Sequence, residues 1–167
     1  MTNEPLFLDV AKIAATLVGF VGVVVALRHP RNEGWTRAEV NGTKLMLEHG
    51  FAAILLGVSP SVLGQHFPKE AEVWQCCSAV LAVFFAYELL INSVRIRYAL
   101  AADSPPRAFF ALLATFFPPT AIMLYLQFKN AVTWHGSLVL AVGAVWLLVA
   151  CCVQFTQFIL RVKPSAA

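Results

Sequence analysis

VWQCCSAVLAVFFAYELLINSVRIR, residues 73–97, is a long apolar run that three polar residues interrupt: Glu88, Asn92 and Arg95. At 100° per residue of an α-helix, these three fall within about 60° of one another. A membrane-spanning helix needs roughly 20 apolar residues, and an ionisable residue inside such a helix is a functional candidate by default. The stretch therefore predicts a membrane-spanning helix with one polar face.

The composition of the whole chain agrees with a membrane protein. Of its 167 residues, 59% are hydrophobic and 13% are charged, and the mean hydropathy is +0.74. A soluble globule of this size needs more polar residues to cover its surface. We predict a multi-pass protein of the cell membrane, the inner membrane if the source is bacterial. The basic residues stand singly at the ends of apolar runs, which does not favour a nucleic-acid partner.

Five apolar runs predict five transmembrane helices in one helical domain, residues 1–167, without a soluble domain. The predicted spans are residues 6–27, 36–64, 73–97, 108–128 and 138–162. The first run has no positive charge before it, unlike a signal peptide, and is kept as a mature helix. Pro60 is expected to bend the second span. Pro118 and Pro119 are expected to kink the fourth, a full break being the alternative.

The basic residues predict an orientation. With five spans, nine of the twelve lysines and arginines fall on one side of the membrane. The positive-inside rule places that side in the cytoplasm. The N-terminus is then expected outside and the C-terminus in the cytoplasm. The nine residues are Arg28, Arg31, Arg37, Lys44, Arg95, Arg97, Arg107, Arg161 and Lys163.

With this orientation, the polar residues inside the spans gather in the cytoplasmic half. If the second, third and fifth spans pack together, they form one cluster of two carboxylates, three amides, an arginine and a histidine. Its members are Glu48, His49, Glu88, Asn92, Arg95, Gln154 and Gln157. Such a cluster can lock helices together as a satisfied polar network, or it can pass protons or small cations.

Three classes of function stay open. The preferred hypothesis is an oligomeric proton or small-cation channel or transporter, because an intramembrane carboxyl group can take up and release a proton. The alternative is a structural or accessory subunit of a larger membrane complex, in which the cluster serves packing. An enzyme is less favoured, because no catalytic motif is present and no catalytic residue is predicted.

No cofactor or metal site is predicted. The four cysteines form two adjacent pairs, Cys76–Cys77 and Cys151–Cys152, without the spacing of zinc or redox motifs. Small embedded thiols are the preferred interpretation, and a redox role is the alternative. Besides the lipid bilayer, the expected partners are further copies of the chain or the subunits of a larger complex.

Overall fold

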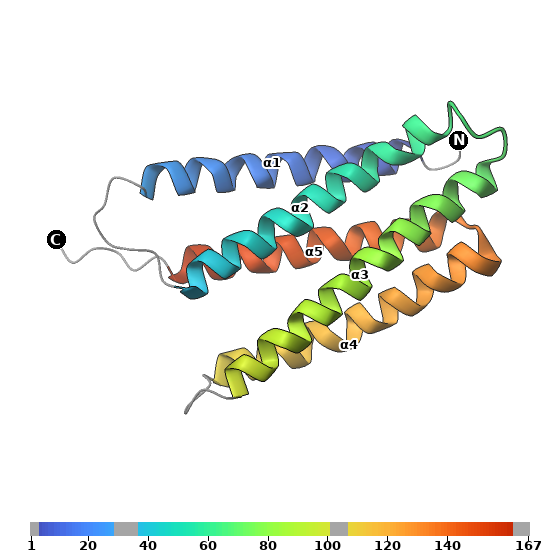
Figure 1. Ribbon diagram of the computed structural model, residues 1–167. Coiled ribbons are helices and arrows are strands. Elements are labelled where there is room, and N and C mark those ends of the chain that lie inside the picture. The colour runs from blue at the N-terminus through green and yellow to red at the C-terminus, as the bar shows by residue number, and fades with distance from the viewer. Residues whose placement is uncertain (1–3, 29–36, 101–106, 162–167) are drawn as a thin grey trace. The chain divides into compact units, whose positions relative to one another are not determined.

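The computed structural model describes the backbone of residues 4–28, 37–100 and 107–161, and the side chains of residues 4–26, 40, 42–94 and 114–156. The described residues form helices and no strand (Figure 1). The helices are α1 (Glu4–Arg28), α2 (Arg37–Leu63), α3 (Glu70–Leu100), α4 (Arg107–Lys129), the π-helical turn η1 (Asn130–Trp134) and α5 (Ser137–Arg161). The prediction of an all-helical chain is confirmed, and the ends of the five long helices lie within three residues of the predicted ones.

Four helices contain a segment that is long and apolar enough to cross a membrane. The segments are Glu4–Ala26, Gly42–Leu63, Glu70–Val94 and Ser137–Thr156. Each has at least 20 residues, or about 30 Å of helix, which matches the hydrocarbon thickness of a bilayer. The side chains at the start of α4 lie outside the described residues, and its role as a fifth span stays a prediction.

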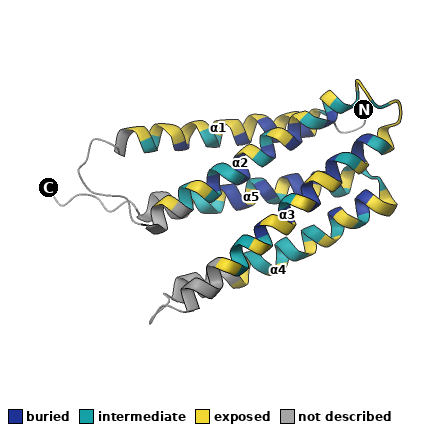
Figure 2. Cartoon of the chain, in the orientation of Figure 1, coloured by how far each residue is buried: buried dark blue, intermediate teal, exposed yellow. Residues whose placement is uncertain are grey.

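Large apolar side chains cover the outer faces of these helices (Figure 2). Val80 and Val83 on α3 are 69% and 70% exposed, and Leu138 on α5 is 72% exposed. Single exposed apolar residues are normal in soluble proteins. Large apolar side chains that are exposed repeatedly along every described helix are consistent with lipid as the surrounding medium.

The chain divides into two compact units. The first holds α1, α2 and the part of α5 from Ala144 onward. A glycine lets α2 approach α1, because a Cβ atom added at Gly57 would lie 2.5 Å from the carbonyl oxygen of Phe7 and 2.7 Å from Cβ of Ala11. The hydroxyl of Ser61 donates to Oε1 of Glu4 at 2.6 Å and joins the end of α2 to the start of α1.

In the same unit, α2 and α5 meet through a cysteine. The thiol of Cys151 donates to the carbonyl oxygen of Met46 at a distance of 3.6 Å. Both residues are fully buried and pack with Val21 of α1. The predicted role of Cys151 as a small packing thiol fits this contact, and all four cysteines are free thiols.

The second unit holds α3, α4, η1 and the start of α5. In Figure 1, α3 and α4 run side by side, and both contact η1. Gly143 brings α5 close to the other two helices of this unit. A Cβ atom added at Gly143 would lie 2.6 Å from Nε2 of Gln127 and 2.6 Å from Cδ2 of Leu81.

The prolines do not interrupt their helices. α2 continues through Pro60, and α4 continues through Pro118 and Pro119, so the break considered for the fourth span is wrong. A proline removes one backbone donor, and hydroxyl groups nearby can donate to carbonyls of the same turns. The hydroxyl of Ser59 donates to the backbone carbonyl oxygen of Leu55. The hydroxyl of Thr120 donates to that of Phe116 at 2.7 Å. The bend at Pro60 and the kink in α4 stay predictions.

Candidate functional site

Glu88 lies on the buried face of α3 and is 1% exposed. The residues of this face recur at intervals of three or four positions, which keeps them on one side of the helix. Its members are Trp74, Ser78, Leu81, Phe85, Glu88 and, half-buried at its end, Asn92. The polar stripe of the sequence is thus a continuation of the buried apolar stripe, and Glu88 points to the interior of the protein.

Asn92 follows Glu88 by one helical turn, and the two side chains meet as the sequence predicts. Nδ2 of Asn92 donates to Oε2 of Glu88 at 3.5 Å, which is long for such a bond. Glu88 lies six residues before the end of the candidate span at Val94, or about 9 Å along the helix axis. The side chain of Arg95, the predicted cationic partner, lies outside the described residues.

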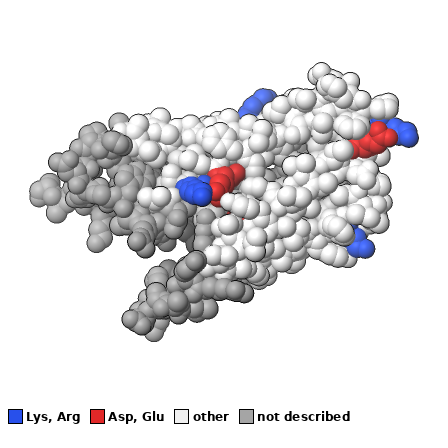
Figure 3. All heavy atoms as spheres, in the orientation of Figure 1, with Lys and Arg blue, Asp and Glu red and all other residues white. Residues whose placement is uncertain are grey.

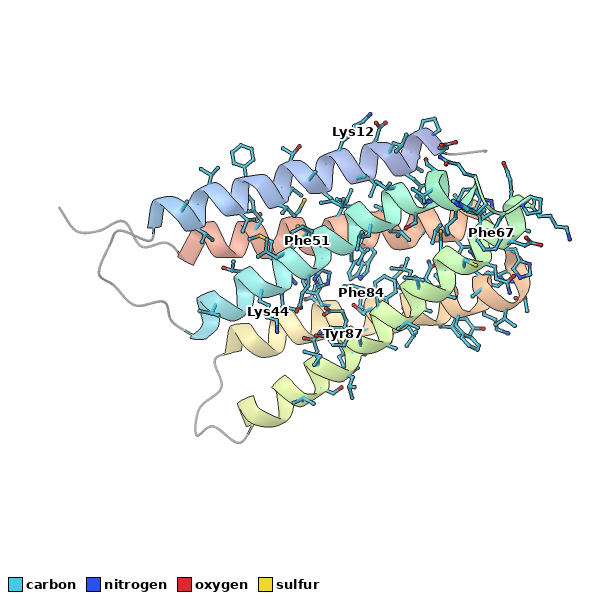
Figure 4. The ribbon with its side chains drawn as sticks, turned by 45° about the horizontal axis from the view of Figure 1, so that its top comes forward. Lys12, Lys44, Phe51, Phe67, Phe84 and Tyr87 are labelled. Carbon is cyan, nitrogen blue, oxygen red and sulfur yellow. The ribbon has the colours of Figure 1, made fainter. Side chains whose placement is uncertain are left out.

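The second carboxylate, Glu48, belongs to the other unit, and its described partner is a lysine. Nζ of Lys44, one turn earlier on α2, is 3.7 Å from Oε1 of Glu48. The lysine side chain is 60% exposed and the glutamate side chain is 22% exposed. Figure 4 labels Lys44 near the start of α2. The i, i+4 spacing could have indicated this pair from the sequence.

Other polar atoms in this unit are buried. His49 is 8% exposed, and its Nδ1 donates to the carbonyl oxygen of Leu45 at 2.8 Å. Oε2 of Glu48 and Oε1 of Gln154 are buried and have no hydrogen bond among the described residues. The side chain of Gln157 lies outside the described residues.

The predicted residues thus divide between the two units. Glu48, His49 and Gln154 belong to the first unit, and Glu88 and Asn92 belong to the second. The contact between Glu88 and Asn92 is described, whereas the assembly of all seven residues into one cluster stays a prediction. Within the described residues, no group of three or more His, Cys, Asp or Glu side chains could hold a metal ion.

A polar network that was not predicted from the sequence lies where α4 turns into α5. Asn130 is fully buried, and its Nδ2 donates to Oγ of Ser78 at 2.7 Å and to the carbonyl oxygen of Gly136 at 2.9 Å. The backbone N–H of Gly136 donates in return to Oδ1 of Asn130 at 2.8 Å. Asn130 therefore closes the turn between α4 and α5 and fastens it to α3.

One turn before Asn130, the amide of Gln127 makes a related contact. Gln127 is fully buried, and its Nε2 donates to the carbonyl oxygen of Val139 at 2.7 Å. The polar composition of residues 129–137 indicated a loop, but helical structure continues through Trp134. It ends at His135, which has a left-handed φ of 52°. The signal for this network was the three-residue spacing of Gln127 and Asn130, which puts both on one helix face.

In comparisons with known proteins, no family model, curated protein or solved structure matches this chain. The class of this protein is therefore inferred from its fold alone. The described residues form an all-helical protein with four helices able to cross a membrane. One of these helices carries a carboxyl group that is 1% exposed.

Proposed function

We propose that the chain is an integral membrane protein with five spans, an outer N-terminus and a cytoplasmic C-terminus. Four helices of sufficient length and their exposed apolar faces support the insertion. Over the described residues, Figure 3 shows charged groups that are few and separated by wide uncharged areas. The asymmetry of the basic residues supports the orientation.

Within this arrangement, Glu88 is the group that takes up and releases protons or binds a small cation. The observation that carries this proposal is its position, which is fully buried on α3 inside a candidate span. An ionised carboxylate in such a place is stable only with cationic or hydrogen-bonding partners, and uptake of a proton or binding of a cation lowers the cost of burying its charge. The amide of Asn92 can donate to the ionised form. A chain of five helices has little room for a pore, so transport is proposed for an oligomer.

Flux measurements on the reconstituted protein test the proposal. The full chain in liposomes with a pH-sensitive dye inside is expected to dissipate an imposed proton or cation gradient. Glu88→Gln removes the ionisable group and keeps the shape, and it is expected to abolish the flux. Glu70→Gln is the matched control, because Glu70 is exposed in the first turn of the same helix. Absence of flux in the unchanged chain, or flux that survives Glu88→Gln, contradicts the proposal.

A structural or accessory subunit is the second candidate function. The observation that favours it is the use of buried polar groups as contacts between helices, as in the bonds from Asn130 to Ser78 and from Gln127 to Val139. Such bonds stabilise helix association in a membrane. If this candidate is right, purification from the native source in mild detergent yields the chain in a fixed ratio with other subunits. A species that contains this chain alone contradicts it.

A further inference from the structure

The buried amide of Gln127 is only partly hydrogen-bonded. Its Nε2 donates to the carbonyl oxygen of Val139 at 2.7 Å, and turning the amide over would set two acceptor oxygens against each other. The remaining atom, Oε1, is buried and has no hydrogen bond among the described residues. The whole side chain of Gln127 is 0% exposed. A carbonyl oxygen in such a place calls for a hydrogen-bond donor, because burying it without one is costly.

Two more polar groups of the second unit have hydrogen-bonding capacity to spare. Oγ of Ser78 accepts from Nδ2 of Asn130, which is the one hydrogen bond of this hydroxyl among the described residues, so its own proton is available to donate. Nε2 of His135 is buried and has no hydrogen bond among the described residues. An imidazole nitrogen donates or accepts, depending on the tautomer. We call Ser78, Gln127 and His135 the turn cluster, because they lie in or beside the turn from α4 to α5.

The packing of the second unit places Ser78 and Gln127 about one helical turn apart. Asn130 contacts Ser78, and Gln127 precedes Asn130 by three residues on the same helix face. Gln127 also lies beside Leu81, because a Cβ atom added at Gly143 would be 2.6 Å from Nε2 of Gln127 and 2.6 Å from Cδ2 of Leu81. Neighbours one turn apart have Cβ atoms about 5–6 Å from each other. One water molecule with two hydrogen bonds bridges a gap of this size.

The turn cluster and Glu88 lie at different depths on the same buried face. Ser78 lies eight residues, or about 12 Å, after the start of the candidate span at Glu70. Glu88 lies ten residues, or about 15 Å, further along α3. Because α3 and α4 run in opposite directions (Figure 1), Gln127 lies on the Glu88 side of Asn130. The remaining separation along α3 is roughly 10 Å, which a file of about three water molecules spans.

We propose that the turn cluster holds internal water and delivers protons, and not metal cations, to Glu88 from the side of the membrane where α4 turns into α5. The inference rests on the proposed function of Glu88, and it names the substrate and one access route. One water accepts from the hydroxyl of Ser78 and donates to Oε1 of Gln127, and another pairs with Nε2 of His135. An excess proton passes along the water file from a hydronium ion to the carboxylate of Glu88, which leaves a neutral water and a neutral carboxyl group.

The chemistry of the turn cluster favours the proton over a metal cation. A metal cation that leaves water needs a ring of oxygen ligands in place of its hydration shell. The turn cluster offers two oxygens, Oγ of Ser78 and Oε1 of Gln127, and no carboxylate. The buried residues of α3 between Ser78 and Glu88 are apolar: Leu81, Ala82 and Phe85. An apolar constriction fills with water only briefly, as hydrophobic gates do, which keeps the passive leak small.

Contact between water and Gln127 is the direct test. In solid-state NMR of the full chain in lipid bilayers, magnetisation transferred from water protons at short mixing times reports the side chains that touch water. We expect transfer to the amide of Gln127 and to the ring of His135, and none to Met46, which is fully buried in an apolar cluster. Ser78→Ala is expected to weaken the transfer to Gln127. Ser93→Ala is the matched control, because the Ser93 hydroxyl bonds within its own helix. Absence of transfer to Gln127 overturns the proposal.

Flux through the reconstituted full chain tests the route. Gln127→Leu removes the free carbonyl oxygen and keeps a side chain of similar size. It is expected to slow proton flux on the order of tenfold, which corresponds to about 1.4 kcal/mol in the barrier. Gln75→Leu is the matched control, because Gln75 is an exposed glutamine on α3. Flux is expected to persist when Na⁺ and K⁺ are replaced by a large organic cation. Flux that requires Na⁺ or K⁺ overturns the proposal, as does flux that Gln127→Leu leaves unchanged.

Labelling with a lipid-soluble carbodiimide separates a lost route from a disturbed fold. Such a reagent reaches Glu88 through the bilayer and modifies the protonated carboxyl group without using the water file. Gln127→Leu is expected to leave the labelling of Glu88, measured by mass spectrometry, unchanged while it slows the flux. Loss of both assigns Gln127 to packing and overturns the route. Absence of flux in the unchanged chain contradicts the proposed function as well, whereas flux that needs Glu88 but not Gln127 contradicts this inference alone.

Discussion

Two polar sites lie on the same buried face of α3, ten residues apart, and they are built differently. At Ser78, a neutral hydroxyl meets a neutral amide from another element, and that amide also binds both backbone groups of Gly136 at distances of 2.8 and 2.9 Å. At Glu88, an ionisable group meets an amide of its own helix at 3.5 Å. Short bonds between distant segments stabilise a fold. The proposed change of protonation or cation binding is assigned to Glu88 because this carboxyl group is fully buried inside a candidate span.

Asn130→Ala should give the largest loss of stability. The substitution removes three hydrogen bonds and leaves the buried hydroxyl of Ser78 and the half-buried backbone groups of Gly136 without this partner. We expect the free energy of unfolding to fall by about 2–4 kcal/mol, measured by denaturation in detergent micelles. Thr133→Ala is the control, because this hydroxyl is exposed and bonds within its own turn. Equal losses of stability from Asn130→Ala and Thr133→Ala would show that the buried bonds of Asn130 stabilise the fold no more than an exposed hydroxyl does.

Gly143→Ala should have the next largest effect. Its methyl group would lie 2.6 Å from Nε2 of Gln127 and from Cδ2 of Leu81, so one of them must move. We expect a loss of about 1–3 kcal/mol from this overpacking, measured in the same way. Gly42→Ala should have the opposite sign and stabilise by about 0.5–1 kcal/mol, because alanine is the better helix former and the site is open. A stabilising Gly143→Ala would show that the contact with Gln127 is looser than described.

Ser78→Ala should be milder than the change at Asn130. It removes one acceptor of Asn130 and leaves the bonds of Asn130 with Gly136 in place. A loss of about 1 kcal/mol is expected from denaturation curves. Ser93→Ala removes a hydroxyl that donates to the carbonyl oxygen of Leu89 in the same helix, and its loss of stability should be smaller than that of Ser78→Ala. If Ser78→Ala lowers the free energy of unfolding as much as Asn130→Ala, most of the stability from Asn130 comes from its bond to α3 and not from closing the turn.

Glu88→Gln should have the smallest effect on stability although it abolishes the proposed flux. Glutamine has nearly the shape of glutamate, and its carbonyl oxygen can still accept from Asn92. The free energy of unfolding is expected to change by less than about 1 kcal/mol. A loss as large as that of Asn130→Ala would place Glu88 with the structural residues and favour the role of a packing or accessory subunit.

Local patterns were enough to predict the helices. The length of each apolar run and the turn residues between runs placed the ends of all five helices within three residues. Periodicity alone also put Glu88 and Asn92 on one face, because the angle per residue of a helix is constant. The role of Asn130 could not be read in this way, since its partner Ser78 is 52 residues away in the sequence. Its place in a polar stretch indicated a loop.

The sequence by itself therefore determined the number, length and apolar character of the helices, because hydrophobicity and helix formation depend on neighbouring residues. Only the tertiary structure decided which polar groups meet. It joined Asn130 to Ser78, brought Gly143 of α5 against Gln127 and Leu81, and left one face of α1 open while it buried the next. Those outcomes depend on how each helix is rotated against its neighbours, and the packing of side chains and close glycine contacts set that rotation.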